Sequence, residues 1–139
     1  MNLLARIFVQ GHALLYRLSD GKLAGTMRGL PVLLLTTRGR KTGAVRRVPV
    51  APFIEGDKVY VIASLGGAPQ HPAWFHNLSA DPQVEVQLRG DKYRARAVVL
   101  PSAERDAVWQ RLVTAMPGFG EYQKKTSRVI PVVRLDRAS

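Results

Sequence analysis

The sequence contains no cysteine, which excludes disulfides, iron–sulfur clusters held by thiolates and thiol catalysis. No stretch approaches the roughly 20 apolar residues that a membrane-spanning helix needs. Acidic residues are scarce: there are ten, against 21 lysines and arginines, and none lies between Asp20 and Glu55. What remains is a chain of 139 residues, 46% of them hydrophobic, which is enough for one domain with one core. The absence of cysteine also fits a reducing compartment, and we expect a cytoplasmic protein.

The excess of positive charge is large, with a net charge of +11 and a pI near 10.9. Such a field attracts nucleic acid, anionic membrane or a phosphorylated or polycarboxylate small molecule. A basic surface without a specific partner is the plain alternative. The charge is concentrated, however, because seven cations lie in the acid-free stretch: Lys22, Arg28, Arg38, Arg40, Lys41, Arg46 and Arg47.

Apolar residues at helical spacing over residues 3–18 predict an amphipathic helix that ends at the "SDGK" segment. We assign residues 1–22 to this N-terminal helix and residues 23–139 to a barrel, as one domain overall. The helix is expected either to pack on the core or to lie on a membrane surface, in which case the protein would sit on the inner face of the cell membrane.

The rest of the chain is rich in strand patterns. Residues 31–37 predict a buried strand, and residues 45–64 predict a hairpin whose first strand runs over 45–55 and whose turn is "EGDK". Pro49 and Pro52 indicate an edge or a bulge in that first strand. A second hairpin is expected over residues 83–100 around Gly90-Asp91, and a last strand over 129–136.

Two helices are expected between these strands. The shorter one covers residues 73–78, and the longer one covers residues 102–116 with Ser102 as its N-cap. The segment that follows, residues 117–128, is expected to be a loop that could cover a pocket. Together the patterns predict a mainly β (α+β) fold: a partly closed antiparallel barrel of about six strands, with an N-terminal helix and one long helix before the last strand.

Metal and hydrolytic sites are disfavoured. The three histidines are His12, His71 and His76, and no carboxylate cluster accompanies them, so no metal site is expected. Ser64 precedes "LGG", but the G-x-S-x-G turn of serine hydrolases is absent.

The basic stretch "RGRKTGAVRR", residues 38–47, has the composition of an anion-binding loop. Its glycines allow backbone N–H groups to turn toward an oxyanion, and Thr42 adds a hydroxyl. The spacing of a nucleotide-binding P-loop is missing, and a strand rather than a helix follows. A solvated hairpin loop is the alternative. The charged donors would be Arg40, Lys41, Arg46 and Arg47.

Two further stretches could border a ligand. In "ASLGGAPQHPAWFHN", residues 63–77, small residues at the end of a strand allow a flat ligand to approach closely. Trp74 is either a core residue or a ligand contact, and Phe75 adds aromatic surface. Phe119 and Tyr122 follow the long helix and place aromatic rings on the predicted lid.

Three motifs together, "TTRGRKTG…RRVPV", "VIASLGGAPQHPAWFHNLSADPQVEV" and "LVTAMPGFGEYQKKTSRVIPVVRL", resemble the deazaflavin-dependent nitroreductase family. The resemblance runs from about residue 30 to 136. Members of this chiefly actinobacterial family bind the deazaflavin coenzyme F(420). The resemblance implies a split antiparallel β-barrel, as in FMN-binding oxidoreductases. It also implies hydride transfer from the reduced coenzyme to a quinone, enone or nitro compound.

The resemblance also assigns roles to residues. The phosphate end of the coenzyme would meet Arg40, Lys41 and Thr42. The coenzyme would run along Arg46, Arg47, Val48, Pro49, Val50 and Ala51. Its ring would be bordered by Ile62, Ala63, Ser64 and Leu65 and enclosed by Ala73, Trp74, Phe75, His76 and Asn77. The acceptor pocket would be lined by Met116, Phe119 and Tyr122, with Tyr122 and Ser64 as candidate catalytic donors.

Three rival functions remain open. The protein could carry the coenzyme without catalysis, or use FMN in place of F(420). A nucleic-acid-binding barrel is disfavoured, because residues 38–47 contain no aromatic residue on which bases could stack. We therefore expect a small-molecule electron acceptor and no nucleic acid as partner, in a monomer or homodimer.

Overall fold

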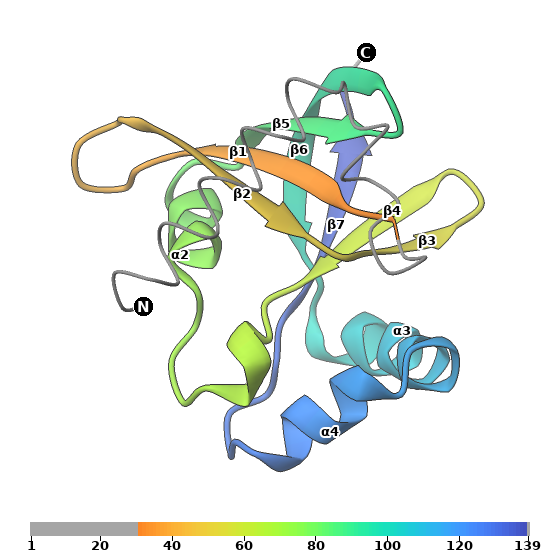
Figure 1. Ribbon diagram of the computed structural model, residues 1–139. Coiled ribbons are helices and arrows are strands. Elements are labelled where there is room, and N and C mark those ends of the chain that lie inside the picture. The colour runs from red at the N-terminus through yellow and green to blue at the C-terminus, as the bar shows by residue number, and fades with distance from the viewer. Residues whose placement is uncertain (1–30, 139) are drawn as a thin grey trace.

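The computed structural model describes residues 31–138, and the predicted helix at residues 1–22 lies outside them. The described chain is mainly β: seven antiparallel strands form one curled sheet, a half-barrel flanked by three helices (Figure 1). The strands are β1 (Leu33–Arg38), β2 (Val45–Val50), β3 (Pro52–Glu55), β4 (Lys58–Ile62), β5 (Gln83–Leu88), β6 (Asp91–Val99) and β7 (Val132–Arg137). The helices are α2 (Ala73–Ala80), α3 (Ser102–Ala115) and α4 (Gly118–Lys124), with a short 3-10 turn, η2, at Leu65–Gly67.

The strand order explains the curl of the sheet. It runs β2-β1-β5-β6-β7-β4-β3, so β2 and β3 are the two edge strands. Only Ala51 separates these edges along the chain, and they must therefore come close together. The predicted continuous strand 45–55 is wrong, because the chain changes partner at Ala51: β2 pairs with β1, and β3 pairs with β4. The sheet consequently has seven strands rather than about six.

The two predicted hairpin turns are close to those observed. The β3–β4 turn contains Gly56 and Asp57, as the "EGDK" segment indicated, and β2 is not part of that hairpin. The β5–β6 hairpin is confirmed, but its turn lies one residue earlier than expected. It is formed by Arg89 and Gly90, which both have left-handed φ values, 53° and 83°.

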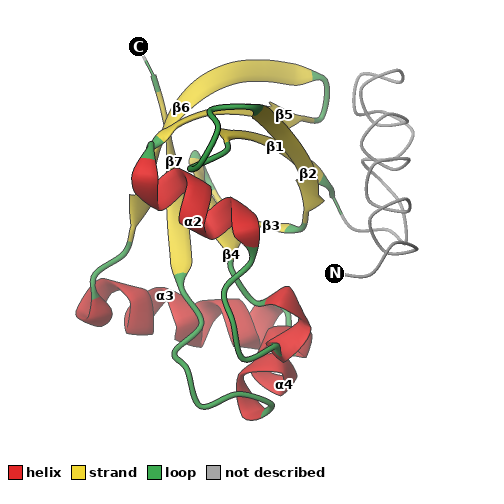
Figure 2. Ribbon diagram, turned by 90° about the vertical axis from the view of Figure 1, so that its left-hand side faces the viewer, coloured by secondary structure: helices red, strands yellow, loops and turns green. Residues whose placement is uncertain are grey.

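Two apolar clusters form the core, and β4 contributes to both because successive strand residues face opposite ways. Val59 and Val61 belong to the cluster inside the half-barrel, and Tyr60 and Ile62 belong to the cluster under the helices. Helix α2 packs Trp74 and Leu78 into the first cluster, whereas α3 packs Val108, Trp109 and Leu112 into the second. Figure 2 shows α2 against the arch of strands and α3 and α4 below it.

Two predictions about the helices are wrong. Pro101, not Ser102, precedes the first residue of α3, and no side chain caps that end. The segment expected to be a loop contains α4, despite Gly118 and Gly120. Tertiary packing outweighs poor helix propensity here, because Phe119 and Tyr122 pack against the second cluster. No helix within residues 31–138 has the length and apolar composition to cross a bilayer.

Candidate functional site

The basic loop between β1 and β2 is closed by its own backbone. The N–H of Gly39 donates to the carbonyl of Ala44, and the N–H of Gly43 donates to the carbonyl of Gly39, both at 2.7 Å. Gly43 has φ 74°, a left-handed conformation that glycine adopts without steric cost. The Thr42 hydroxyl oxygen accepts from the N–H of Ala44 at 3.2 Å, which leaves its proton free to be donated.

Asn77 of α2 anchors this loop to the barrel. Its side-chain oxygen accepts from the N–H of Arg40 at 3.1 Å, and its amide nitrogen donates to the hydroxyl of Thr37 at 3.2 Å. Asn77 is 5% exposed and Thr37 is 1% exposed, so the bond between their side chains is buried, and the bond to Arg40 is partly buried. The side chain of Asn77 therefore holds the loop in place, and the contact with the coenzyme that the resemblance assigns to Asn77 stays a prediction.

The loop keeps its charge and two of its donors available. Arg38, Arg40, Lys41, Arg46 and Arg47 form no ion pair with any residue in the described range 31–138. Within that range the N–H groups of Lys41 and Thr42 have no acceptor either. Backbone N–H donors beside cations and a hydroxyl proton are the groups that binding an oxyanion requires, and the loop stays a candidate for such a site.

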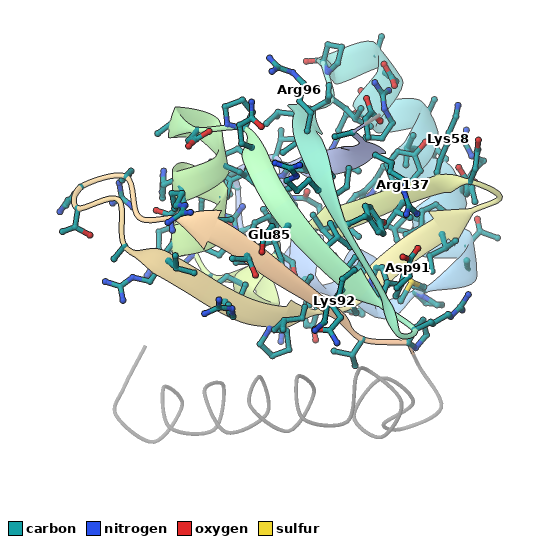
Figure 3. All side chains as sticks on the ribbon, turned by 90° about the horizontal axis from the view of Figure 1, so that it is seen from above. Lys58, Glu85, Asp91, Lys92, Arg96 and Arg137 are labelled. Carbon is teal, nitrogen blue, oxygen red and sulfur yellow. The ribbon has the colours of Figure 1, made fainter. Side chains whose placement is uncertain are left out.

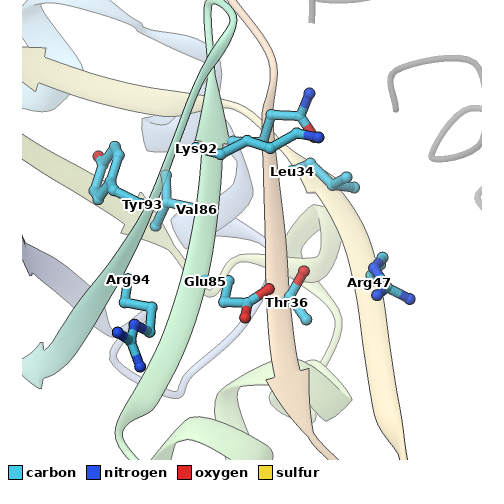
Figure 4. Close-up of a pocket in the computed structure, with 9 residues that line it drawn as sticks. Leu34, Thr36, Arg47, Glu85, Val86, Lys92, Tyr93 and Arg94 are labelled. Atoms are coloured by element: carbon cyan, nitrogen blue, oxygen red, sulfur yellow. The ribbon is translucent and has the colours of Figure 1, made fainter. Parts of the chain in front are cut away.

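Arg46 and Arg47 do not share a face of the sheet. In the register Arg46 lies opposite Thr37, on the side where Asn77 bonds, whereas Arg47 lies opposite Thr36. Arg47 lines an open hollow of about 610 Å³ on the outside of the sheet, together with Thr36 and Glu85 (Figure 4). The two neighbouring arginines therefore serve different surfaces, and Arg47 is separated from the loop site.

The outer surface near this hollow carries mixed charge. Glu85 of β5 and Lys92 of β6 lie there (Figure 3), and Arg94 of β6 lines the hollow with them. A second hollow, about 730 Å³, lies between the β3–β4 and β5–β6 turns. Neither hollow contains the predicted ring or acceptor residues, so both are distinct from the candidate site.

The segment after β4 was predicted to border the coenzyme ring. The side chains of Ile62 and Ala63 are buried in the core, and Ser64 is 8% exposed. Leu65 is 45% exposed and has φ 45°. A ligand would therefore meet Leu65 through its side chain and the preceding residues mainly through their backbone.

Gly67 in this segment lies directly against α4. A Cβ at this position would be 2.7 Å from the carbonyl oxygen of Tyr122 and 2.9 Å from the Cβ of Lys125, and φ is 87°. Only glycine fits there. The second predicted stretch thus contacts the third through backbone, and η2 and α4 are neighbours.

Aromatic rings gather at the start of α2. The ring centroids of His71 and Phe75 are 4.7 Å apart, and those of His71 and His76 are 5.7 Å apart. Trp74 is a core residue, 8% exposed, and Ala73 is exposed. Phe75 and His76 are half-buried and remain candidates for contact with a ligand.

The predicted acceptor residues also lie together. Met116, Phe119 and Tyr122 are half-buried against the second cluster, and the Phe119 and Tyr122 rings meet edge to face at 5.9 Å. Among residues 31–138 the hydroxyl of Tyr122 has no hydrogen-bond partner, so it is free to donate. The segment predicted to run along the coenzyme comprises Val48, Pro49, Val50 and Ala51. The side chains of Val48 and Val50 pack against the barrel core, which leaves less of them for contact with a ligand.

Arg128 is the residue that sequence reasoning missed. Its guanidinium bonds to the segment after β4 and to His71, residues between 57 and 65 positions away. Burial, followed by the charge of Arg128 and then of His76, holds the pKa of His71 below its ordinary value of 6.5. No spacing rule connects an arginine to distant backbone carbonyls, so the sequence carried no signal for it.

Comparisons with known proteins agree with one another. A family model described as F(420)H(2)-dependent quinone reductase matches residues 8–136. A Mycobacterium tuberculosis protein named as an F(420)H(2)-dependent quinone reductase is 35% identical over 130 residues, covering 91% of this chain and 87% of that protein. A solved structure of an F(420)-H(2) dependent reductase (FDR-A) is 40% identical with TM-score 0.69, covering 76% and 94%. Another, described as a domain-swapped dimer, is 40% identical with TM-score 0.70, covering 76% and 80%.

Proposed function

The chain belongs to the F(420)H(2)-dependent quinone reductase family, and we propose that it reduces quinones at the site formed by the basic loop, η2, α2 and α4. It is an oxidoreductase that transfers a hydride from reduced F(420) to a small electrophilic acceptor. The finer proposals concern the residues that hold the coenzyme and the identity of the acceptor.

The observation that carries the site assignment is the basic loop. Its backbone is fixed by internal bonds and by Asn77, while its cations have no protein partner within residues 31–138. Such a loop fits the phosphate end of the coenzyme, with Lys41 and Thr42 as the donors nearest the oxyanion. Arg40 and Arg46 are available to the acidic groups of the tail.

The ring would lie beside the strand-end segment, Ala63 to Leu65, and the start of α2. These elements are linked to the loop by Asn77 and to each other by Arg128. Ile62, Trp74 and the β2 residues Val48 and Val50 would shape the site from inside the core. Arg47 and Pro49 alternate with Val48 and Val50 along β2, so their side chains face the other side of the sheet. We assign them no contact with the ring.

When bound, the reduced coenzyme supplies the hydride at its ring C5. The protein binds and orients the partners and excludes water. Tyr122 can donate to an acceptor oxygen as it gains charge, with Phe119 and Met116 packed beside it. Ser64 is the weaker candidate, because it is almost buried and its carbonyl already accepts from Arg128.

The experiment follows the oxidation of reduced F(420) with soluble quinones, enones and nitro compounds as acceptors. We expect turnover with quinones, and Tyr122→Phe should lower turnover roughly 100-fold with coenzyme affinity unchanged. Absence of turnover with every acceptor, despite coenzyme binding, would favour the alternative that the protein carries the coenzyme without catalysis. The FMN alternative is not supported, since the matched family is named for F(420)H(2).

The remaining proposals are the split-barrel topology, a homodimer and peripheral membrane contact. The curled seven-stranded sheet supports the first, and the relative described as a domain-swapped dimer supports the second. The third rests on the apolar pattern in residues 1–22 and the net charge. Light scattering would measure the mass in solution, and co-sedimentation with anionic vesicles would compare the full chain with a chain lacking residues 1–22.

A further inference from the structure

Arg128 joins the strand-end segment to the start of α2. Its guanidinium donates to the carbonyls of Ala68 at 2.9 Å, Ala63 at 3.1 Å and Ser64 at 2.9 Å, and it bonds to Nδ1 of His71 at 2.9 Å. One side chain therefore bonds to residues from both ends of the loop that connects β4 to α2. No other side chain within residues 31–138 bonds to these carbonyls.

The backbone of Arg128 is itself held. The side-chain amide of Gln123 in α4 donates to the carbonyl of Arg128 at 2.7 Å, and its oxygen accepts from the N–H of Ile130 at 3.0 Å. Arg105 of α3 donates to the same Gln123 oxygen at 3.2 Å and to the carbonyl of Ile130 at 3.0 Å. The guanidinium thus projects from a frame fixed by α3 and α4.

We propose that Arg128 is a positioning residue, whose guanidinium holds the Ala63–Ala68 segment and His71 in the one arrangement that accepts the coenzyme ring. The inference rests on the proposed function, which places the ring beside this segment. It assigns a role to a residue that does not touch the ring in this account and that acts through backbone carbonyls.

The role requires an arginine. A guanidinium presents donors in a rigid planar fork, whereas a lysine ammonium is a single point of charge on a flexible stem. A lysine at position 128 would keep the charge but could not meet carbonyls 63, 64 and 68 and the His71 ring together. Arg128→Lys should therefore rescue little of what Arg128→Met loses.

His71 is part of the same arrangement. Since a guanidinium can only donate, Nδ1 of His71 must be unprotonated and accept, and the ring must be neutral. The charged or titratable groups facing it are Arg128 from the C-terminal loop and His76 from α2. Protonation of His71 would remove the acceptor and set a second cation against Arg128. His71→Lys places a cation at this position at neutral pH.

The test measures the affinity of oxidised F(420), and of the deazaflavin ring without its phosphorylated chain, for the purified full chain. Arg128→Met should weaken binding of the ring fragment about tenfold, and Arg128→Lys and His71→Lys should each weaken it severalfold. Lys41→Ala should leave the ring fragment unaffected. Arg134→Met is the matched control, because among the described residues the Arg134 side chain bonds to Glu104 and Asp136 alone, away from this segment.

A readout without coenzyme completes the test. Proton NMR titration of the histidine rings should show the pKa of His71 rising toward its ordinary value in Arg128→Met, and unchanged in Arg134→Met. Ring-fragment affinity equal to the wild type in a folded Arg128→Met protein would overturn the inference. So would a loss that merely follows the unfolded fraction in all variants, including Arg134→Met. If Arg128→Met does not fold, His71→Lys decides: unchanged ring affinity would overturn the inference. Failure of the wild type to bind F(420) at all would instead refute the proposed function.

Discussion

Two cationic regions of this molecule use their charge differently. The basic stretch at residues 38–47 forms no ion pair within the described part of the chain, and its side chains stand mostly exposed. In the C-terminal region every arginine named here bonds to protein groups: Arg105, Arg111, Arg128, Arg134 and Arg137. The same residue type is therefore structural in one region and available to a ligand in the other.

The surroundings account for the difference. The C-terminal arginines lie beside carboxylates or buried carbonyls, such as Glu55 for Arg111 and the carbonyl of Ile130 for Arg105. The basic loop lies in the acid-free part of the sequence. Asn77 anchors it through the backbone N–H of Arg40, which leaves the Arg40 guanidinium available. Net charge alone thus says little about function, and the partners of each cation say more.

The largest expected effect comes from adding a methyl group at Gly67 of η2, compared with the same change at Gly43 of the basic loop. Gly67→Ala should lower the free energy of unfolding by about 3 kcal/mol, because the new methyl group would overlap the carbonyl of Tyr122 and Lys125 at a left-handed φ. Gly43→Ala has open space and should cost only the conformational part, about 1 kcal/mol. Urea unfolding measures both.

Gly66→Ala serves as the control within the same segment, since its φ is 64° and nothing lies within 4 Å of the added atom. It should resemble Gly43→Ala. Equal losses for all three variants would show that η2 does not press against α4.

The second prediction removes a free cation. Lys41→Ala should weaken binding of the full coenzyme by about tenfold to a hundredfold, because a hydrogen bond to a charged group contributes about 1.5–3 kcal/mol. Binding should also weaken as salt rises. Lys58→Ala, at the first residue of β4, is the matched control and should leave coenzyme affinity unchanged. Calorimetry at two salt concentrations gives both quantities. If Lys41→Ala and the wild type bind the coenzyme equally, the loop is a solvated hairpin and not an anion-binding site.

The third prediction compares Arg46 and Arg47, whose side chains lie on opposite faces of β2. Arg46→Ala should weaken coenzyme binding about twofold to fivefold, the range of an exposed pair. Arg47→Ala should leave affinity unchanged, because Arg47 lies on the outer face. The same titration compares them, and a larger effect at Arg47 would contradict the face assignment.

The smallest effect concerns pH. The pKa of His71 is lowered in the folded state, mainly by burial, so the unfolded chain binds more protons than the folded chain below pH 6.5. This contribution to stability is complete above pH 6.5 and is lost as the pH falls toward the lowered pKa. His71→Gln should flatten that part of the curve of unfolding free energy against pH. An unchanged slope would mean that His71 does not contribute.

Local patterns predicted much of this fold. The hairpin at residues 83–100, the helix at 73–78 and the long helix are confirmed, because each depends on periodicity within one segment. The split of residues 45–55 was missed, since alternation continues through Ala51 and only pairing with distant strands separates β2 from β3. Helix α4 was missed because packing against α3 overrides its glycines.

For the candidate site, composition pointed to the basic loop, and composition together with the family resemblance pointed to α2 and η2. Strand alternation could also have separated Arg46 from Arg47, because adjacent residues face opposite ways. The roles of Asn77 and Arg128 could not be predicted, since their partners lie between 37 and 65 positions away in the sequence and most of them are backbone groups. Such contacts exist only once the barrel has formed.

The most direct measurement is the affinity of the purified protein for oxidised F(420) and for FMN, by calorimetry at low salt. We expect micromolar binding of F(420), a free energy of about −8 kcal/mol, and much weaker binding of FMN. Lys41→Ala should reduce the affinity for F(420). Binding of FMN as tight as that of F(420), or tighter, would contradict the account.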